Sequence, residues 1–348
     1  MFISADDLRL QYSGRIDFKD PRNPKLVYPS SYVKTIFTGT SLKAVFSNRR
    51  SYWNNYLGCI LDGKQSKKLL PQSGKVTLEL ANGLDSGKHT LLLFKRMDSC
   101  HMLTFHGLEV DDGAEIFAPE EKPKRKIEVY GDSVSAGEVS EAVDYVGKPD
   151  PEHQGEYSNS WYSYAWMTAR KLNAQIHNIS QGGIALIDGT GWFGNSYMGM
   201  ESVYDKIEYN PDLGLPKTWD FSLYRPHVVI IAIAQNDSHP EDYMKGDYNC
   251  EKAVNWRAHY KDFVRKIRSI YPKAVIILAT TILEHDKSWD KSIEQVKREI
   301  NDKNVYHFMY SNNGCGTKGH IRIPEADKMS DELAGFINSL GENIWCDE

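Results

Sequence analysis

The chain has 348 residues, of which 41% are hydrophobic and 26% are charged. These ordinary globular values exclude a disordered or fibrous chain, and the length suggests two domains or one large one. The formal net charge is -5, from 42 Lys and Arg residues against 47 Asp and Glu residues. This balance gives no reason to expect nucleic acid or an anionic membrane as a partner.

The first residues carry neither the basic start nor the apolar stretch of a secretory signal, and no apolar run approaches the roughly 20 residues that span a bilayer. The five cysteines form no CxxC pair, so neither a disulfide framework nor a zinc cluster is expected. We therefore expect a cytoplasmic protein, although a secreted chain whose signal has been removed would look the same.

Residues 1–118 predict an all-β sandwich domain, similar to a jelly roll. Short apolar runs end at Gly, Asn or Asp, and some alternate strictly, as VTLEL does at 76–80. A period of two is typical of antiparallel sheets with one solvated face. The runs are VKTIFTGT (33–40), LKAVFSN (42–48), YLGCILDG (56–63), KVTLELANG (75–83) and KHTLLLFKR (88–96).

Residues 119–126, with two prolines and dense charge, predict a linker to a second domain over 127–348. Strand and helix patterns alternate in this part, which indicates an α/β parallel sheet with helices on both faces. Apolar residues step by three and four over 251–270, as on one face of a helix, and again over 329–340. The expected strands are 126–130, 174–179, 228–234, 274–280 and 305–310.

Residues 185–224 separate two of these strands without a helix of matching length. The segment is rich in Gly, Trp and Tyr. Loops this long in a compact domain are usually functional or disordered, and the aromatic content favours a wall of the substrate site.

Polar residues follow four of the expected strands, at the sheet edge where α/β proteins bind ligands. Ser133 lies in a GDSVSAG turn after the first strand, and glycines 182 and 183 follow the second. Asn236 follows the third strand, and His320 lies in a glycine-rich loop after the fifth. A hydroxyl, a base and neutral N–H donors form the inventory for acyl transfer through an oxyanion.

Other catalytic signatures are missing from the sequence. No GxSxG elbow of the α/β-hydrolase type surrounds Ser133, and neither a GxxxxGK[ST] loop nor an HExxH motif occurs. No spacing of carboxylates and histidines argues for a metal, so we expect no metal and no organic cofactor.

The ordered blocks GDS at 131–133, Asn178 to Gly183, Asn236 with Asp237, and a late His320 resemble the SGNH (GDSL-type) hydrolase superfamily. A preceding β-sandwich makes the chain most similar to carbohydrate esterase family 2. The resemblance covers nearly the whole chain. It implies a flavodoxin-like parallel sheet, and a serine esterase that removes O-acetyl groups from plant polysaccharides.

The resemblance assigns Ser133 as the nucleophile and His320 as the base. The backbone N–H groups of Ser133 and Gly183, with the Asn236 side chain, would hold the oxyanion, and Gly182 is a rival for Gly183. Two departures stand out: Ala234 replaces the usual Gly of the third block, a small change that we expect to be harmless, and Thr317 replaces the usual Asp. We therefore expect a Ser–His dyad oriented by a backbone carbonyl, with a carboxylate from elsewhere as the alternative.

Two further histidines, His239 and His285, are rivals of His320, and Asp237 is expected to cap or brace the nucleophile loop. Trp289 and Trp192 are candidate platforms for a sugar ring, and Trp289 follows the fourth strand at the correct sheet edge.

The resemblance implies that the substrate is an acetylated oligosaccharide of the mannan or xylan type, with the primary 6-hydroxyl as a candidate position. Two alternatives remain open. One is a lipid or aryl esterase on the same scaffold, and the other is a carbohydrate-binding protein whose site has decayed. The sequence does not indicate an oligomeric state.

Overall fold

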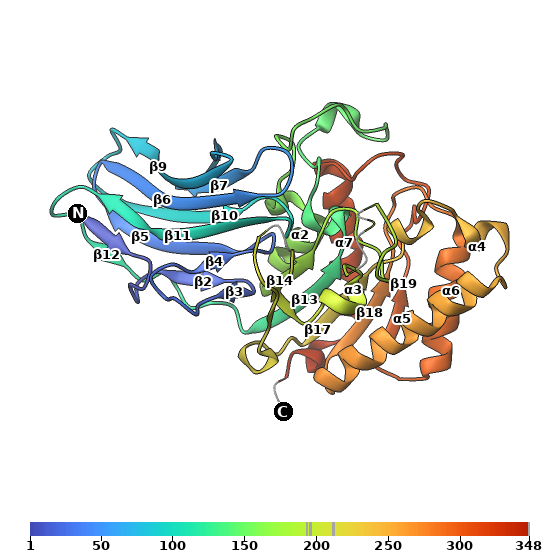
Figure 1. Ribbon diagram of the computed structural model, residues 1–348. Helices are drawn as coiled ribbons and strands as arrows, with labels where there is room; N and C mark the ends of the chain where they lie inside the picture. The colour runs from blue at the N-terminus through green and yellow to red at the C-terminus, as the bar shows by residue number, and fades with distance from the viewer. Residues whose placement is uncertain (193, 195–196, 211–212, 347–348) are drawn as a thin grey trace.

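The computed structural model describes residues 1–192, 194, 197–210 and 213–346. Two parts lie side by side (Figure 1): strands alone form the N-terminal part, and helices flank a central sheet in the C-terminal part. The predicted fold class, a β-sandwich followed by a helix-flanked parallel sheet, is confirmed. The change from one part to the other falls between Phe117 and Arg125, and the domain limits at 118 and 126 stay predictions.

The N-terminal part consists of two antiparallel sheets. In one sheet the order is β3-β4-β11-β6-β9, with β1 beside β11, and in the other it is β12-β5-β10-β7-β8, with β2 beside β5. The strands are β1 Phe2–Ser4, β2 Gln11–Ser13, β3 Ile16–Asp17, β4 Lys25–Leu26, β5 Tyr32–Thr38, β6 Ser41–Arg50, β7 Tyr56–Leu61, β8 Lys64–Leu69, β9 Ser73–Asn82, β10 Lys88–Lys95, β11 His101–Val110 and β12 Ile116–Phe117.

The sandwich core forms where the alternating apolar residues of both sheets face each other. In β5, Val33, Thr35 and Phe37 are buried and the residues that alternate with them are half-buried. In β9, the half-buried Leu78 lies between two exposed residues. This is the pattern expected from a period of two, because successive side chains of a strand point to opposite faces.

The C-terminal part is built on a parallel sheet in the order β14-β13-β17-β18-β19. Every residue of β17 and β18 is buried, as expected for strands covered on both faces. The order is 2-1-3-4-5 in chain sequence, so the ligand crevice is expected between β13 and β17, at their carboxyl ends. The strands are β13 Arg125–Gly131, β14 Ala174–Ser180, β17 Val228–Ala232, β18 Val275–Ala279 and β19 Val305–Phe308.

Helices cover both faces of this sheet. The apolar faces of α2 and α7 pack with one side, and those of α5 and α6 pack with the other. The helix predicted over 251–270 is observed as α5 with these bounds. The helices are α1 Ser133–Ala136, α2 Tyr164–Lys171, α3 Met200–Val203, α4 Tyr243–Gly246, α5 Glu251–Ile270, α6 Lys287–Ile300 and α7 Ile323–Ser339. Short 3₁₀ turns span Val143–Tyr145, Ser160–Tyr162, Phe221–Leu223, Asn236–Ser238 and Glu342–Trp345.

The long insertion between β14 and β17 has little regular structure in its described residues. It contains the four-residue α3 and a two-stranded ribbon of β15, Lys206–Glu208, with β16, Lys217–Thr218. Among the described residues, no helix combines the length and the apolar character that crossing a lipid bilayer requires.

Candidate active site

Ser133 lies at the turn where β13 ends and α1 begins. The Asp132 carboxylate caps the helix by accepting the N–H of Val134 at 3.0 Å, as a good N-cap residue does. Gly137 ends the helix in the left-handed conformation, with φ 81°. The serine is therefore held on a short rigid element at the carboxyl edge of the sheet.

His320 contacts Ser133 directly. Its Nε2 lies 2.8 Å from Ser133 Oγ, and its Nδ1 lies 2.5 Å from Oδ2 of Asp150. Because an ionised carboxylate only accepts hydrogen bonds, the Nδ1 atom carries the proton and Nε2 is free to accept the serine hydroxyl. The three side chains form a Ser–His–Asp relay across 187 residues of sequence.

The expectation that a backbone carbonyl orients His320 is wrong. The orienting group is Asp150, a carboxylate from elsewhere in the chain, which also accepts the backbone N–H of His320 at 2.9 Å and forms an ion pair with the guanidinium of Arg322 at 2.8 Å. Thr317, at the position where the family carries its Asp, is buried and bonds through its backbone to Glu284.

Nothing in the spacing of the sequence pairs position 150 with position 320. One local signal is Gly319, since a Cβ there would lie 2.5 Å from Asp150 Oδ1. Only glycine lets this carboxylate approach the histidine so closely.

Negative charge surrounds His320. Burial acts to lower the pKa of His320, but Glu138 and Asp150 outweigh it and raise the pKa to about 8. Burial would raise the pKa of Asp150, yet the hydrogen bond and charge of His320 hold it below its ordinary value. Burial raises the pKa of Glu138 to about 7, an increase that His320 reduces. The site is therefore built to stabilise an imidazolium ion.

Three neutral donors are candidates to hold the oxyanion beside Ser133. In the described part of the chain, the backbone N–H groups of Ser133 and Gly183 meet no protein acceptor. The Asn236 side chain donates to Asp132 at 3.3 Å and keeps a second N–H. The rival Gly182 donates its N–H to Asp98 at 2.6 Å and is therefore not available to a substrate. These contacts favour Gly183 over Gly182.

Asp237 is buried and braces the surrounding loops rather than the nucleophile turn. Its Oδ1 accepts the backbone N–H of Leu186 at 3.0 Å and the ring N–H of Trp256 at 2.7 Å. Burial raises the pKa of this carboxyl to about 7.

The role of Trp289 as a sugar platform is contradicted. Its ring is 1% exposed and packs edge-on against Trp256, and its N–H donates to Asp242 at 3.0 Å. The residue lies at the predicted sheet edge, but α6 turns its side chain into the core. Trp192, in contrast, is 70% exposed and stacks on the ring of His239 with centroids 3.6 Å apart.

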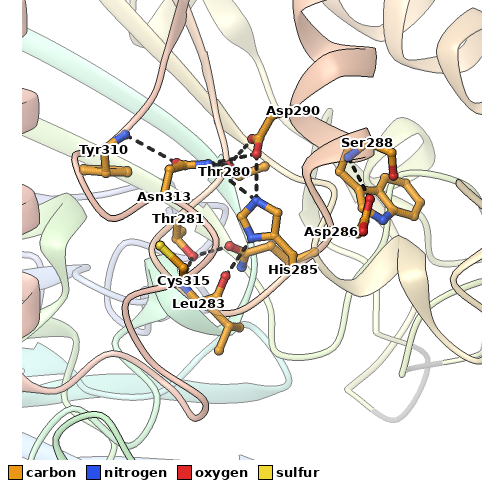
Figure 2. Close-up of polar contacts among 12 residues, drawn as sticks. Thr280, Thr281, Leu283, His285, Asp286, Ser288, Asp290, Tyr310, Asn313 and Cys315 are labelled. Carbon is orange, nitrogen blue, oxygen red and sulfur yellow. Dashed lines mark hydrogen bonds and ion pairs between the residues drawn. The ribbon is translucent and has the colours of Figure 1, made fainter. Parts of the chain in front are cut away.

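The two rival histidines have other partners. His239 lies against Trp192, and His285 is buried in a separate cluster (Figure 2). In that cluster Nε2 of His285 lies 3.1 Å from Asp290, and Nδ1 lies 2.6 Å from the carbonyl of Leu283. Asn313 donates to the same Asp290 carboxylate at 3.0 Å. His285 therefore helps to hold the loop that precedes His320.

The sequence did not predict that the sandwich domain places side chains beside the candidate active site. Its residues Tyr52 and Asp98 lie beside Gly182: their side-chain oxygens are 3.3 and 3.0 Å from the position that a Cβ on Gly182 would take. Trp53 packs on His153, three residues after Asp150. No motif marks these residues, because they reach the site through the packing of one domain on the other.

Residues 12–119 match the family described as Carbohydrate esterase 2 N-terminal. Over 97% of its length the chain is 30% identical to cellulase/esterase CelE of Acetivibrio thermocellus, of which it spans 40%. It is 28% identical to the acetylxylan esterase / glucomannan deacetylase of Cellvibrio japonicus, with 97% of this chain and 90% of that protein covered. The chain is thus similar to carbohydrate esterases of family 2.

The likeness extends to solved structures of this family. A family two carbohydrate esterase from Clostridium thermocellum, in complex with cellohexaose, superposes with a TM-score of 0.78 at 26% identity, over 97% of this chain and 100% of that one. The resemblance that the sequence motifs predicted is confirmed. The chain carries both the sandwich and the helix-flanked sheet of the solved esterase.

Proposed function

We propose that this protein is a carbohydrate O-acetyl esterase with Ser133 as nucleophile and His320 as base. The observation that carries the proposal is the Ser133–His320–Asp150 relay beside free N–H donors at the carboxyl edge of the sheet. The esterase names of the relatives support the same reaction class. The solved family two carbohydrate esterase in complex with cellohexaose supports an oligosaccharide ligand.

In the proposed reaction, His320 Nε2 accepts the proton of Ser133 Oγ, and the oxygen attacks the acetyl carbonyl carbon. The N–H groups of Ser133 and Gly183 and the side chain of Asn236 stabilise the oxyanion. The bond between the acetyl carbonyl carbon and the sugar oxygen breaks, and the sugar alkoxide takes the proton from His320. Water, deprotonated by His320, then attacks the acetyl-enzyme and releases acetate. Asp150 keeps the imidazole oriented throughout the reaction, and its carboxylate does not become protonated.

The proposed substrate is an acetylated oligosaccharide of the xylan or mannan type, deacetylated at a position that includes the primary 6-hydroxyl. The exposed Trp192, stacked on His239 three residues from Asn236, is the aromatic platform that we propose for a sugar ring. We also propose a cytoplasmic location, which the five free thiols support, and oligosaccharides rather than intact polymer would then be the substrate.

Replacing the nucleophile tests the proposal. Ser133→Ala should abolish acetate release from acetylated xylan, mannan and pectin oligosaccharides, because no other hydroxyl among the described residues is bonded to His320. NMR of the products maps the position that the wild-type protein deacetylates. Circular dichroism should show an unchanged fold in the variant, and appreciable residual turnover would exclude Ser133 as the nucleophile.

The lipid or aryl esterase and the binding protein, the two alternative functions, each predict a different outcome in such assays. A lipid or aryl esterase would hydrolyse p-nitrophenyl octanoate better than the acetate, whereas we expect the acetate to be preferred. A binding protein with a decayed site would bind oligosaccharide without releasing acetate. The intact hydrogen bonds of Ser133, His320 and Asp150 favour the active enzyme.

A further inference from the structure

The turn between β10 and β11 of the sandwich reaches the segment from Ser180 to Gly183 after β14, called here the glycine loop, in the proposed esterase site. Ser99 donates both its backbone N–H, at 3.3 Å, and its hydroxyl, at 3.1 Å, to the carbonyl of Ser180. One residue earlier, Asp98 Oδ2 accepts the N–H of Gly182 at 2.6 Å. Residues 98 and 99 are buried, so these bonds are sheltered from water.

Asp98 is held in place by its own domain. Its Oδ2 also accepts the hydroxyl of Tyr52 at 2.7 Å, and its Oδ1 accepts the N–H of Cys100 at 3.0 Å. The buried ammonium of Lys95 bonds the carbonyls of Met97 and Asp98 and fixes the turn. With three donors already bound, this carboxylate is a fixed support and not a free ligand for substrate.

The glycine loop needs such a support. A Cβ on Gly182 would lie 2.7 Å from Glu138 Oε2 and 3.0 Å from Asp98 Oδ2, so only glycine fits there. Gly183 has φ 73°, in the left-handed region. Two adjacent glycines have many accessible conformations, and the direction of the Gly183 N–H is therefore set by what holds Gly182.

We propose that Asp98 is a positioning residue: by accepting the N–H of Gly182, it directs the N–H of Gly183 at the oxyanion. The sandwich domain is then part of the catalytic apparatus, in addition to any role in binding glycan. This inference rests on the proposed function, because it assigns a support to the oxyanion donor of that reaction.

The test compares Asp98→Ala with Asp98→Asn in the full chain, using p-nitrophenyl acetate, which lacks a sugar. Alanine removes the acceptor, so kcat should fall about 10–100-fold while KM changes less than about threefold. Asparagine can keep its carbonyl toward Gly182 and should retain kcat within about fivefold. Affinity for a methyl trifluoromethyl ketone, whose serine adduct is an oxyanion, should fall with kcat for the alanine variant.

Lys67→Met is the matched control. Lys67 bonds Glu141 across the same domain boundary at 3.2 Å but does not touch the glycine loop, so kcat should stay within about twofold. If Asp98→Ala does not fold, Asp98→Ser takes its place, since its hydroxyl is too short to reach Gly182.

The inference is overturned if the alanine or serine variant keeps wild-type kcat, or if the ketone binds it as tightly as it binds the wild type. It is also overturned if the asparagine variant loses as much as alanine. All three of these results require a wild-type enzyme that releases acetate. A wild type without acetate release contradicts the proposed function itself.

Discussion

At the scale of single residues, the charge around His320 sets the pH at which the proposed enzyme works. The pKa of the imidazole is raised to about 8, because Glu138 and Asp150 stabilise its protonated form more than burial disfavours it. A general base must be neutral to accept a proton. Catalysis is therefore present above this pKa and is lost as the pH falls through it.

We expect kcat/KM for p-nitrophenyl acetate to rise between about pH 6 and 9 with a midpoint near 8. Asp150→Asn should move the midpoint to lower pH, since it removes a negative charge that favours the imidazolium. It should also lower the plateau about 10²-fold or more, because the amide no longer holds the required tautomer.

Glu152→Gln is the control for this experiment, because Glu152 is an exposed carboxylate two residues from Asp150. Its profile should match the wild type. A rate that stays flat from about pH 5 to 8 in the wild type would argue against a histidine base.

At the scale of elements, the end of β17 carries strain that the sequence analysis did not expect. Ala234 has φ 154°, a conformation that favours glycine, which is the usual residue of the family at this position. Ala234 therefore carries backbone strain that a glycine would not, and the expectation that the substitution is harmless stays a prediction. The strained turn leads directly to Asn236, a proposed oxyanion donor, and strain of this kind is common beside active sites.

Ala234→Gly should leave the free energy of unfolding within about 0.5 kcal/mol of the wild type, because relief of strain offsets the lost methyl burial and the added chain entropy. Ala232→Gly, in the regular part of β17, has no strain to relieve and should cost about 1.5 kcal/mol. Urea denaturation measures both values. Equal losses in the two variants would show that position 234 is unstrained.

At the scale of the whole molecule, the two domains share buried contacts. Arg15, from the turn between β2 and β3, is 0% exposed and lies 3.3 Å from Glu128 of β13. Its guanidinium also donates to the carbonyl of Tyr204 at 2.6 Å and to that of Lys206 at 3.0 Å, in the long insertion. One side chain thus joins the sandwich, the sheet and the insertion.

Arg15→Met should lower the free energy of unfolding by about 3–5 kcal/mol, because it leaves the Glu128 charge buried without its partner. The double variant Arg15→Met, Glu128→Gln should recover part of this loss. The exposed pair of Arg125 and Glu342 provides the control, and Arg125→Met should cost less than about 1 kcal/mol. Similar losses for both arginines, measured in urea, would contradict a special role for the domain boundary.

The sequence alone determined the fold class and the four blocks that carry Ser133, Gly183, Asn236 and His320. These features are local: strand and helix periods are written in neighbouring residues, and a residue that follows a parallel strand must lie at one sheet edge. For the same reason the helix of α5 was predicted with its observed bounds.

The tertiary structure decided which groups meet. Asp150 reaches His320 over 170 residues of sequence. Asp98, from the other domain, accepts the N–H of Gly182, so that the N–H of Gly183 is the one proposed to bind the oxyanion. Trp289 is buried because the rotation of α6 about its axis turns it inward. Such pairings depend on how separate elements pack against each other, and no spacing along the chain encodes that geometry.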